Sequence, residues 1–333
     1  MRRLVLRKET EGLKGSFFSI AVAAALLLLP SLALGVDSGF DGGRLDYTVK
    51  FNGKQVDWHT FAFFMLPGQT EEIRVLGING QAVEIETSGA AELVALGVGH
   101  WRFRAPETPG LHPISIRPAG HLPMTLNVVT KVPTEAKENG SLNGYRIGRY
   151  PQRPLRDDPI YLPPAGKIEV TPDMLGMPVS PHFTLGQFLC KQQPDHWPKY
   201  LVLREGLIAK LEVILAEVNA RGIRTDTFAI LSGHRTPWYN NAIGNSLFSR
   251  HVWGGAADIF IDNNGDGRMD DLNGDGTVDV RDAQVLIDII ETLYRDGELE
   301  DRPGGLGLYG PRPHRGPFVH VDARGHPARW AFP

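Results

Sequence analysis

Three residues, His251, Asp258 and His320, constrain the fold of this chain more than any other feature. His251 and Asp258 are seven positions apart, whereas His320 lies much later, in the segment 318–322. Two imidazoles and one carboxylate form a zinc-binding set that leaves a fourth position open for water, and this open position distinguishes catalytic from structural zinc sites. If the fold brings the three together, a hydrolase is expected; little else in the sequence indicates an enzyme.

Composition narrows the class of protein. With 333 residues, 42% of them hydrophobic and 22% charged, the chain has room for two ordinary globular domains. Its single cysteine, Cys190, excludes an intramolecular disulfide and a cysteine-based zinc site. A formal net charge of -3 and the lack of a basic stripe argue against a nucleic-acid partner.

Residues 1–35 predict a secretory signal peptide. Basic residues between Arg2 and Lys14 precede an apolar run from Phe17 to Leu29, and Ala33-Leu34-Gly35 offers small residues for cleavage. The apolar run is shorter than the roughly 20 residues that span a bilayer, although an uncleaved membrane anchor is the alternative. We therefore expect a periplasmic or secreted protein with no stable membrane insertion after cleavage.

Residues 45–132 predict a β domain. Apolar and polar residues alternate in four segments, and Asn52-Gly53 and Asn79-Gly80 are turn signals. The pattern is typical of a small antiparallel sandwich of immunoglobulin-like kind, with a binding or spacer role. Residues 133–164, rich in proline, glycine and charge, predict a linker.

A second domain is expected over residues 179–333. Apolar residues from Leu203 to Val218 recur at helical spacing, and Arg221-Gly222 ends the run. Short apolar strands are expected at 228–231, 257–261 and 318–322. Because helices come first and short strands come later, the predicted class is α+β.

Four ordered motifs in this domain are Ser232-Gly233-His234-Arg235-Thr236-Pro237, then Asn240, then Ser249-Arg250-His251-x6-Asp258, then His320-Val321-Asp322. Together they closely resemble the zinc D-Ala-D-Ala carboxypeptidases and murein endopeptidases, over roughly residues 179–333. The resemblance implies that His251, Asp258 and His320 hold zinc. It also implies that Arg235 interacts with the substrate and stabilises charge developing on the attacked carbonyl; the alternative for Arg235 is a structural ion pair.

The general base departs from the pattern of that family, which usually places Glu or His a few residues before the last zinc ligand. Here Pro317 and Arg315 stand three and five positions before His320, and His314, six before, is the nearest suitable group. Asp322 is a second candidate, although it equally suits a role in orienting His320. The departure leaves open a catalytically inactive protein that binds cell-wall peptides.

An insertion at 262–295 carries an EF-hand-like calcium signature. Oxygen ligands fall at the loop positions that calcium requires, with glycine at the sixth. The predicted calcium ligands are Asp271, Asn273, Asp275, the carbonyl of Thr277, Asp279 and Asp282. The loop resembles those of dockerins. The segment from Asp262 to Asn273 repeats the motif in degenerate form. A structural clip beside the active site is favoured over a docking module, and a solvated acidic loop is the alternative.

The sequence thus predicts an exported metallopeptidase that uses Zn²⁺ and Ca²⁺ and hydrolyses the stem peptides or cross-links of peptidoglycan. It leaves open which bond is cut and the oligomeric state.

Overall fold

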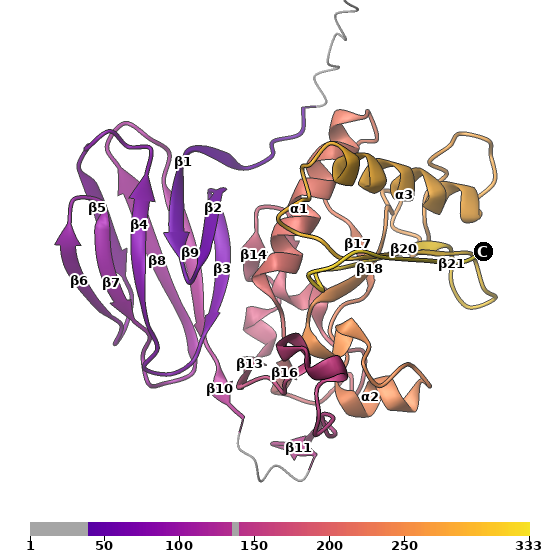
Figure 1. The fold of residues 1–333 in the computed structure, drawn as a ribbon, viewed down its shortest axis with the longest axis horizontal. Coiled ribbons are helices and arrows are strands. Elements are labelled where there is room, and N and C mark those ends of the chain that lie inside the picture. The colour runs from indigo at the N-terminus through magenta and orange to yellow at the C-terminus, as the bar shows by residue number, and fades with distance from the viewer. Residues whose placement is uncertain (1–38, 135–139) are drawn as a thin grey trace, which may run out of the picture. The chain divides into compact units, whose positions relative to one another are not determined.

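The computed structural model describes residues 39–134 and 140–333, and the predicted signal segment, residues 1–35, lies outside them. Among these residues no helix is long and apolar enough to cross a membrane. Residues 44–130 form two sheets, as the alternating pattern predicts (Figure 1). The five-stranded sheet has the order β2 (Lys54–Trp58), β1 (Arg44–Phe51), β4 (Thr70–Leu76), β7 (His100–Arg104) and β6 (Glu92–Gly97). The four-stranded sheet has the order β3 (Thr60–Met65), β9 (Met124–Thr130), β8 (Gly110–Pro118) and β5 (Val83–Thr87).

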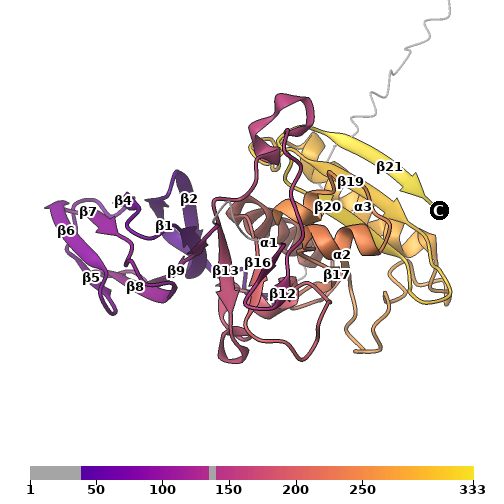
Figure 2. The same cartoon turned by 90° about the horizontal axis from the view of Figure 1, so that it is seen from below.

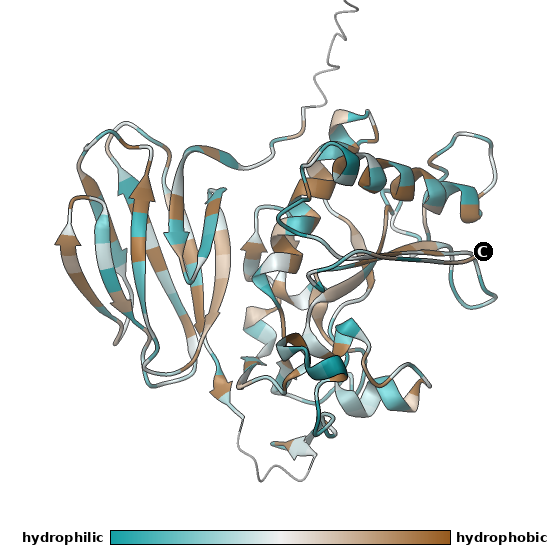
Figure 3. Ribbon diagram, in the orientation of Figure 1, coloured by the Kyte–Doolittle hydropathy of each residue, from teal (hydrophilic) through white to brown (hydrophobic). Residues whose placement is uncertain are grey.

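Aromatic side chains pack between the two sheets. Phe51 of β1 meets Phe63 of β3 edge to face, with 5.0 Å between centroids, and also meets Phe103 of β7. Figure 3 shows the alternation as bands of brown and teal along the strands. The sandwich is not purely antiparallel as expected, because β3 and β9 pair in parallel.

The segment predicted as a linker carries short elements, and its tyrosines pack against residues later in the chain. Tyr145 and Tyr161 are buried, and the Tyr150 hydroxyl donates to the Val252 carbonyl at 3.2 Å. The small strands here and up to residue 201 are β10 (Val132–Pro133), β11 (Ser141–Leu142), β12 (Tyr145–Arg146), β13 (Gly166–Val170), β14 (Pro178–Ser180), β15 (Phe183–Thr184) and β16 (Lys199–Leu201). The 3-10 helices are η1 (Leu155–Asp157), η2 (Pro159–Tyr161), η3 (Pro172–Met174) and η4 (Leu185–Phe188).

A second five-stranded sheet carries the candidate site. Its order is β17 (Ala229–Ser232), β18 (Ala256–Phe260), β20 (Phe318–Asp322), β19 (Gly305–Tyr309) and β21 (Ala328–Phe332). The α-helices are α1 (Glu205–Ala220), α2 (Pro237–Ala242) and α3 (Val280–Arg295). In Figure 1 this sheet is viewed edge-on, with α3 along one of its faces. Figure 2 shows β19, β20 and β21 from another side. The predicted apolar stripe of α1 is buried, including Leu207, Leu211 and Leu215.

The predicted α+β class is wrong, because the structure is mostly β. Strands contain 36% of the residues and helices contain 19%. The strands are distributed over many small sheets. A capping box at Thr184 opens only the single turn η4, and the region before α1 folds into short strands rather than helices. Helical spacing is a weak signal in short segments, where tertiary pairing decides the backbone conformation.

Candidate metal centre

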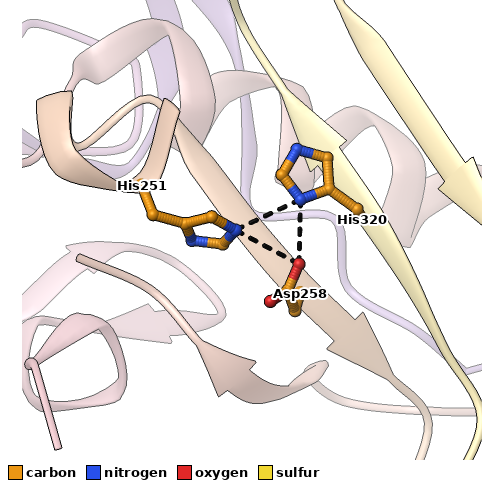
Figure 4. A group of neighbouring side chains, drawn as sticks. All are labelled: His251, Asp258 and His320. Carbon is orange, nitrogen blue, oxygen red and sulfur yellow. Dashed lines mark hydrogen bonds and ion pairs between the residues drawn. The ribbon is translucent and has the colours of Figure 1, made fainter. Parts of the chain in front are cut away.

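His251, Asp258 and His320 converge in the structure (Figure 4). The Nδ1 atom of His320 lies 2.9 Å from Oδ1 of Asp258 and 3.1 Å from Nε2 of His251. The remaining pair, His251 Nε2 and Asp258 Oδ1, is 3.2 Å apart. Ligands at about 2.0–2.1 Å from a tetrahedral ion lie roughly 3.3 Å from one another, so this spacing fits a single metal ion. The buried His–Asp–His group can therefore hold a metal ion.

Strand pairing explains why two ligands meet across a long stretch of sequence. Asp258 of β18 and His320 of β20 are direct partners in the antiparallel ladder. Their side chains point to the same face of the sheet, while Val319 and Val321 point to the other, where they are fully buried. Direct cross-strand partners have Cβ atoms about 5 Å apart, which suits two ligands of one ion.

His251 reaches the same point from the 3-10 helix η5 (Arg250–Trp253), which ends at Gly254. Gly254 has φ 64°, and a Cβ there would clash with the carbonyl oxygen of Val202. Only glycine fits this turn, so Gly254 sets the path of the chain from His251 into β18. Nδ1 of His251 donates to the Gly233 carbonyl at 2.7 Å, which leaves Nε2 free for a metal.

Electrostatics keep the carboxylate of this group ionised. Burial alone would raise the pKa of Asp258, but the charges and hydrogen bonds of His251 and His320 outweigh it and hold that pKa well below its usual range. Burial lowers the pKa of His251 despite the nearby carboxylate. Burial also opposes protonation of His320, yet its hydrogen bonds to Asp258 and Asp322 raise its pKa overall.

Asp322 lies behind His320 and is shielded from solvent. Its Oδ2 is 3.2 Å from Nε2 of His320, and Arg324 forms an ion pair with it at 2.5 Å. Its Oδ1 accepts the backbone N–H of Gly305 at 2.8 Å. With its side chain 0% exposed and both oxygens engaged, Asp322 is placed to orient the His320 ring rather than to meet a water in the cleft.

Arg235 is engaged with the ligand carboxylate. Its Nη2 donates to Oδ2 of Asp258 at 2.6 Å, and its Nε donates to the Ser232 hydroxyl at 2.7 Å. These bonds fix the second oxygen of Asp258 and turn the first toward the two imidazoles. The ion pair considered as an alternative in the sequence is thus present in the structure.

The three residues line an open cleft of about 800 Å³. His314 lies in its wall and is exposed, so it shares the cleft with His251, whereas Asp322 does not line it. Trp330 and Tyr309 shape the wall beside His320; the rings of Trp330 and His320 are 5.1 Å apart. Sequence reasoning missed both aromatic residues, since a lone Trp or Tyr near the end of a chain carries no motif.

The predicted calcium residues make a different set of contacts. Asp271, Asn273 and Asp275 accept backbone N–H groups of their own loop. Asp279 and Asp282 form the capping box of α3. Arg281 pairs with Asp275 at 2.6 Å and with Asp279 at 2.8 Å. Among the described residues, the carboxylates of this loop do not form a close three-ligand group of the kind found at His251.

Comparisons with known proteins leave the family open. No family model and no curated protein matches the chain. A quarter of the chain, 25%, is similar to 96% of the titin M3 domain, at 18% identity and a TM-score of 0.17. A 30% share is similar to 58% of domains 5–6 of the S-layer protein SbsC, at 12% identity and a TM-score of 0.18. A 26% share is similar to 25% of a nucleoside hydrolase-related hypothetical protein from Saccharophagus degradans, at 11% identity and a TM-score of 0.18. Similarities this weak carry no information on function.

Proposed function

We propose that this chain is an exported zinc-dependent peptidase that hydrolyses the stem peptides or cross-links of peptidoglycan. The observation that carries the proposal is the convergence of His251, Asp258 and His320 at the wall of an open cleft. Two imidazole nitrogens and one carboxylate oxygen are a donor set that suits zinc, with one position left for water or substrate. The substrate class comes from the motif resemblance around Arg235 and His251.

Bound at these residues, zinc would lower the pKa of a water molecule to about 7 and polarise the carbonyl of the scissile peptide bond. The bond from Nδ1 of His251 to Gly233 would leave Nε2 of that ring to hold the ion, and Asp322 would orient His320 in the same way through its contact with Nε2. Arg235 holds Asp258 and adds positive charge beside the attacked carbonyl.

His314 is the group we assign to proton transfer. It lines the cleft together with the metal ligands, and it is exposed, so its ring is accessible to water in the cleft. The other candidate, Asp322, is fully buried behind His320.

The alternative is a protein on the same fold that binds cell-wall peptides without cleaving them. One observation favours it: among the residues that line the cleft, Asp258 is the only carboxylate, so no glutamate is available as a base. This alternative also predicts that the protein binds zinc, but it predicts no cleavage of the peptide.

Digestion of intact sacculi and of isolated muropeptides by the purified mature protein tests the proposal. We expect cleavage by the zinc-loaded wild type, loss of both zinc and cleavage in His251→Ala and Asp258→Ala, and zinc without cleavage in His314→Ala. Stoichiometric zinc in the wild type with no cleavage of either substrate would refute the enzyme and leave the binding protein. Cleavage at wild-type rate by His314→Ala would refute only the assignment of the base.

We also propose that the loop 271–282 binds calcium and stiffens the insertion. Support comes from the spacing of its oxygen residues and from Gly276, whose φ of 81° allows the turn at the sixth position. Calcium would have to displace Arg281 from Asp275 and Asp279, so we expect modest affinity.

A further inference from the structure

The cleft around the metal group is strongly positive. The basic side chains that line it, apart from its histidines, are Lys191, Arg235, Arg250, Arg315 and Arg324. Asp258 is the only lining residue with a carboxylate. A bound divalent ion would add to this excess, so the cleft favours an anionic ligand.

Two of these cations are paired with carboxylates: Arg235 pairs with Asp258, and Arg324 pairs with Asp322. Arg250 has no carboxylate partner among the residues that the structure describes, but it is 2% exposed and lies over the ring of Tyr161, which places its charge below the surface of the cleft. Arg315 and Lys191 therefore remain to meet a ligand, and they differ in one respect: Lys191 is an exposed point charge on a flexible chain, whereas Arg315 is fixed.

Three contacts hold the Arg315 guanidinium in place. One terminal nitrogen, Nη1, donates to the Gly310 carbonyl at 2.8 Å and to the Gly316 carbonyl at 3.2 Å. The guanidinium also lies over the ring of Phe318, 4.5 Å from its centroid. Within the described part of the chain its hydrogen bonds go to carbonyl oxygens alone, so its full charge and the donors on Nε and Nη2 are left for another partner.

We infer that Arg315 binds a carboxylate of the peptide that occupies this cleft, beside the metal group. A planar fork that is fixed at one nitrogen and stacked on a ring matches the two oxygens of a carboxylate, and such charge-assisted pairs are the strong ones. Arg315 lines the same cleft as His251, Asp258 and His320. The inference rests on the proposed function for the identity of the ligand as a peptide.

Two carboxylates of a stem peptide offer this chemistry: the one at the C-terminus and one carried inside the peptide. An acetylated tripeptide ending in D-Ala-D-Ala, as free acid and as C-terminal carboxamide, probes the first. A cross-linked peptide with its internal carboxyl free or amidated probes the second. Binding to the zinc-loaded protein is measured by calorimetry in the His314→Ala background, which should hold zinc without cleaving the peptide. The proteins compared are this parent with Arg315 intact (wild type at position 315), Arg315→Gln, Arg315→Lys and the control Arg312→Gln, which removes an exposed arginine from the same segment.

We expect the parent and Arg312→Gln to bind one free acid roughly 10–100-fold more tightly than its amide. Arg315→Gln should bind acid and amide equally, and Arg315→Lys should recover part of the difference. Equal weakening for acid and amide in Arg315→Gln, unchanged discrimination in that variant, or no discrimination by the parent for either pair would each overturn the inference. Discrimination by the parent without cleavage by the wild type would refute the proposed hydrolysis alone, and cleavage by the wild type without discrimination by the parent would refute the role of Arg315 alone.

Discussion

Replacing Asp322 with Asn tests whether this buried carboxylate acts through His320. The substitution keeps the shape of the side chain and removes its charge and one acceptor oxygen. In the wild type, Asp322 faces Nε2 of His320 at 3.2 Å, pairs with Arg324 at 2.5 Å and accepts from Gly305. All three contacts lie in a place where the carboxylate is 0% exposed, so water cannot replace them.

Two quantities should change in Asp322→Asn: the affinity for zinc and the free energy of unfolding. Loss of a carboxylate that orients a metal-ligating histidine typically costs 10–100-fold in metal affinity, or about 1.4–2.7 kcal/mol. The folded state loses a further amount because Arg324, with its side chain 19% exposed, is left without its partner. Breaking a buried pair costs about 3–5 kcal/mol, and the partial exposure of Arg324 moves the expected loss to the lower end, about 3 kcal/mol.

Zinc affinity is measured by competition with a chromophoric chelator, and the free energy of unfolding by urea titration of the metal-free protein. Asp226→Asn, at a side chain 84% exposed, serves as the matched control and should change neither quantity. Wild-type zinc affinity in a folded Asp322→Asn protein would refute the orienting role. Loss of cleavage with zinc affinity retained would instead indicate that Asp322 handles a proton.

Two further predictions concern groups near the site. Lys210 is fully buried, donates to the Tyr294 hydroxyl and the Asp322 carbonyl, and burial lowers its pKa from 10.5 to about 7. Between these values the unfolded chain binds the proton and the folded chain does not, so the free energy of unfolding should rise with pH, by at most about 5 kcal/mol in total. Urea titrations from pH 6 to pH 10 should show this rise in the wild type and lack it in Lys210→Met; parallel curves would contradict the assignment. For the insertion, calcium added to chelator-treated protein should raise the melting temperature by a few degrees in the wild type and not in Asp271→Asn, and an unchanged melting temperature in the wild type would count against a calcium site.

The sequence was sufficient to predict the sandwich strands and the three metal-binding candidates, for separate physical reasons. Period-two alternation is a local property that survives folding, so β1 and β7 could be predicted directly from residues 47–51 and 101–104. The metal group was predictable because Ser-x-His-x6-Asp fixes two ligands within one turn and one strand. His320 could be added only through the resemblance, because strand pairing is not visible in one sequence.

Other features could not be predicted because they depend on tertiary contacts. The partner of Arg235 was open between substrate and carboxylate until the fold placed Asp258 beside it at 2.6 Å. Trp330 reaches the cleft from β21, which pairs with β19, and Arg315 reaches it from the segment before β20; neither arrangement is visible in the sequence. The fold class was wrong for the same reason, since the short strands before α1 are stabilised by neighbours rather than by their own residues.

The direct pairing of Asp258 with His320 also bears on how such a chain can change. The two ligands are 62 positions apart, yet the ladder alone fixes their spacing. Closing a longer loop costs only about 0.6 kcal/mol for each doubling of its length, so the segment between β18 and α3 can grow, shrink or be exchanged at little cost to the ligand geometry. This segment can therefore vary in length and sequence while the pairing of β18 with β20 keeps Asp258 opposite His320.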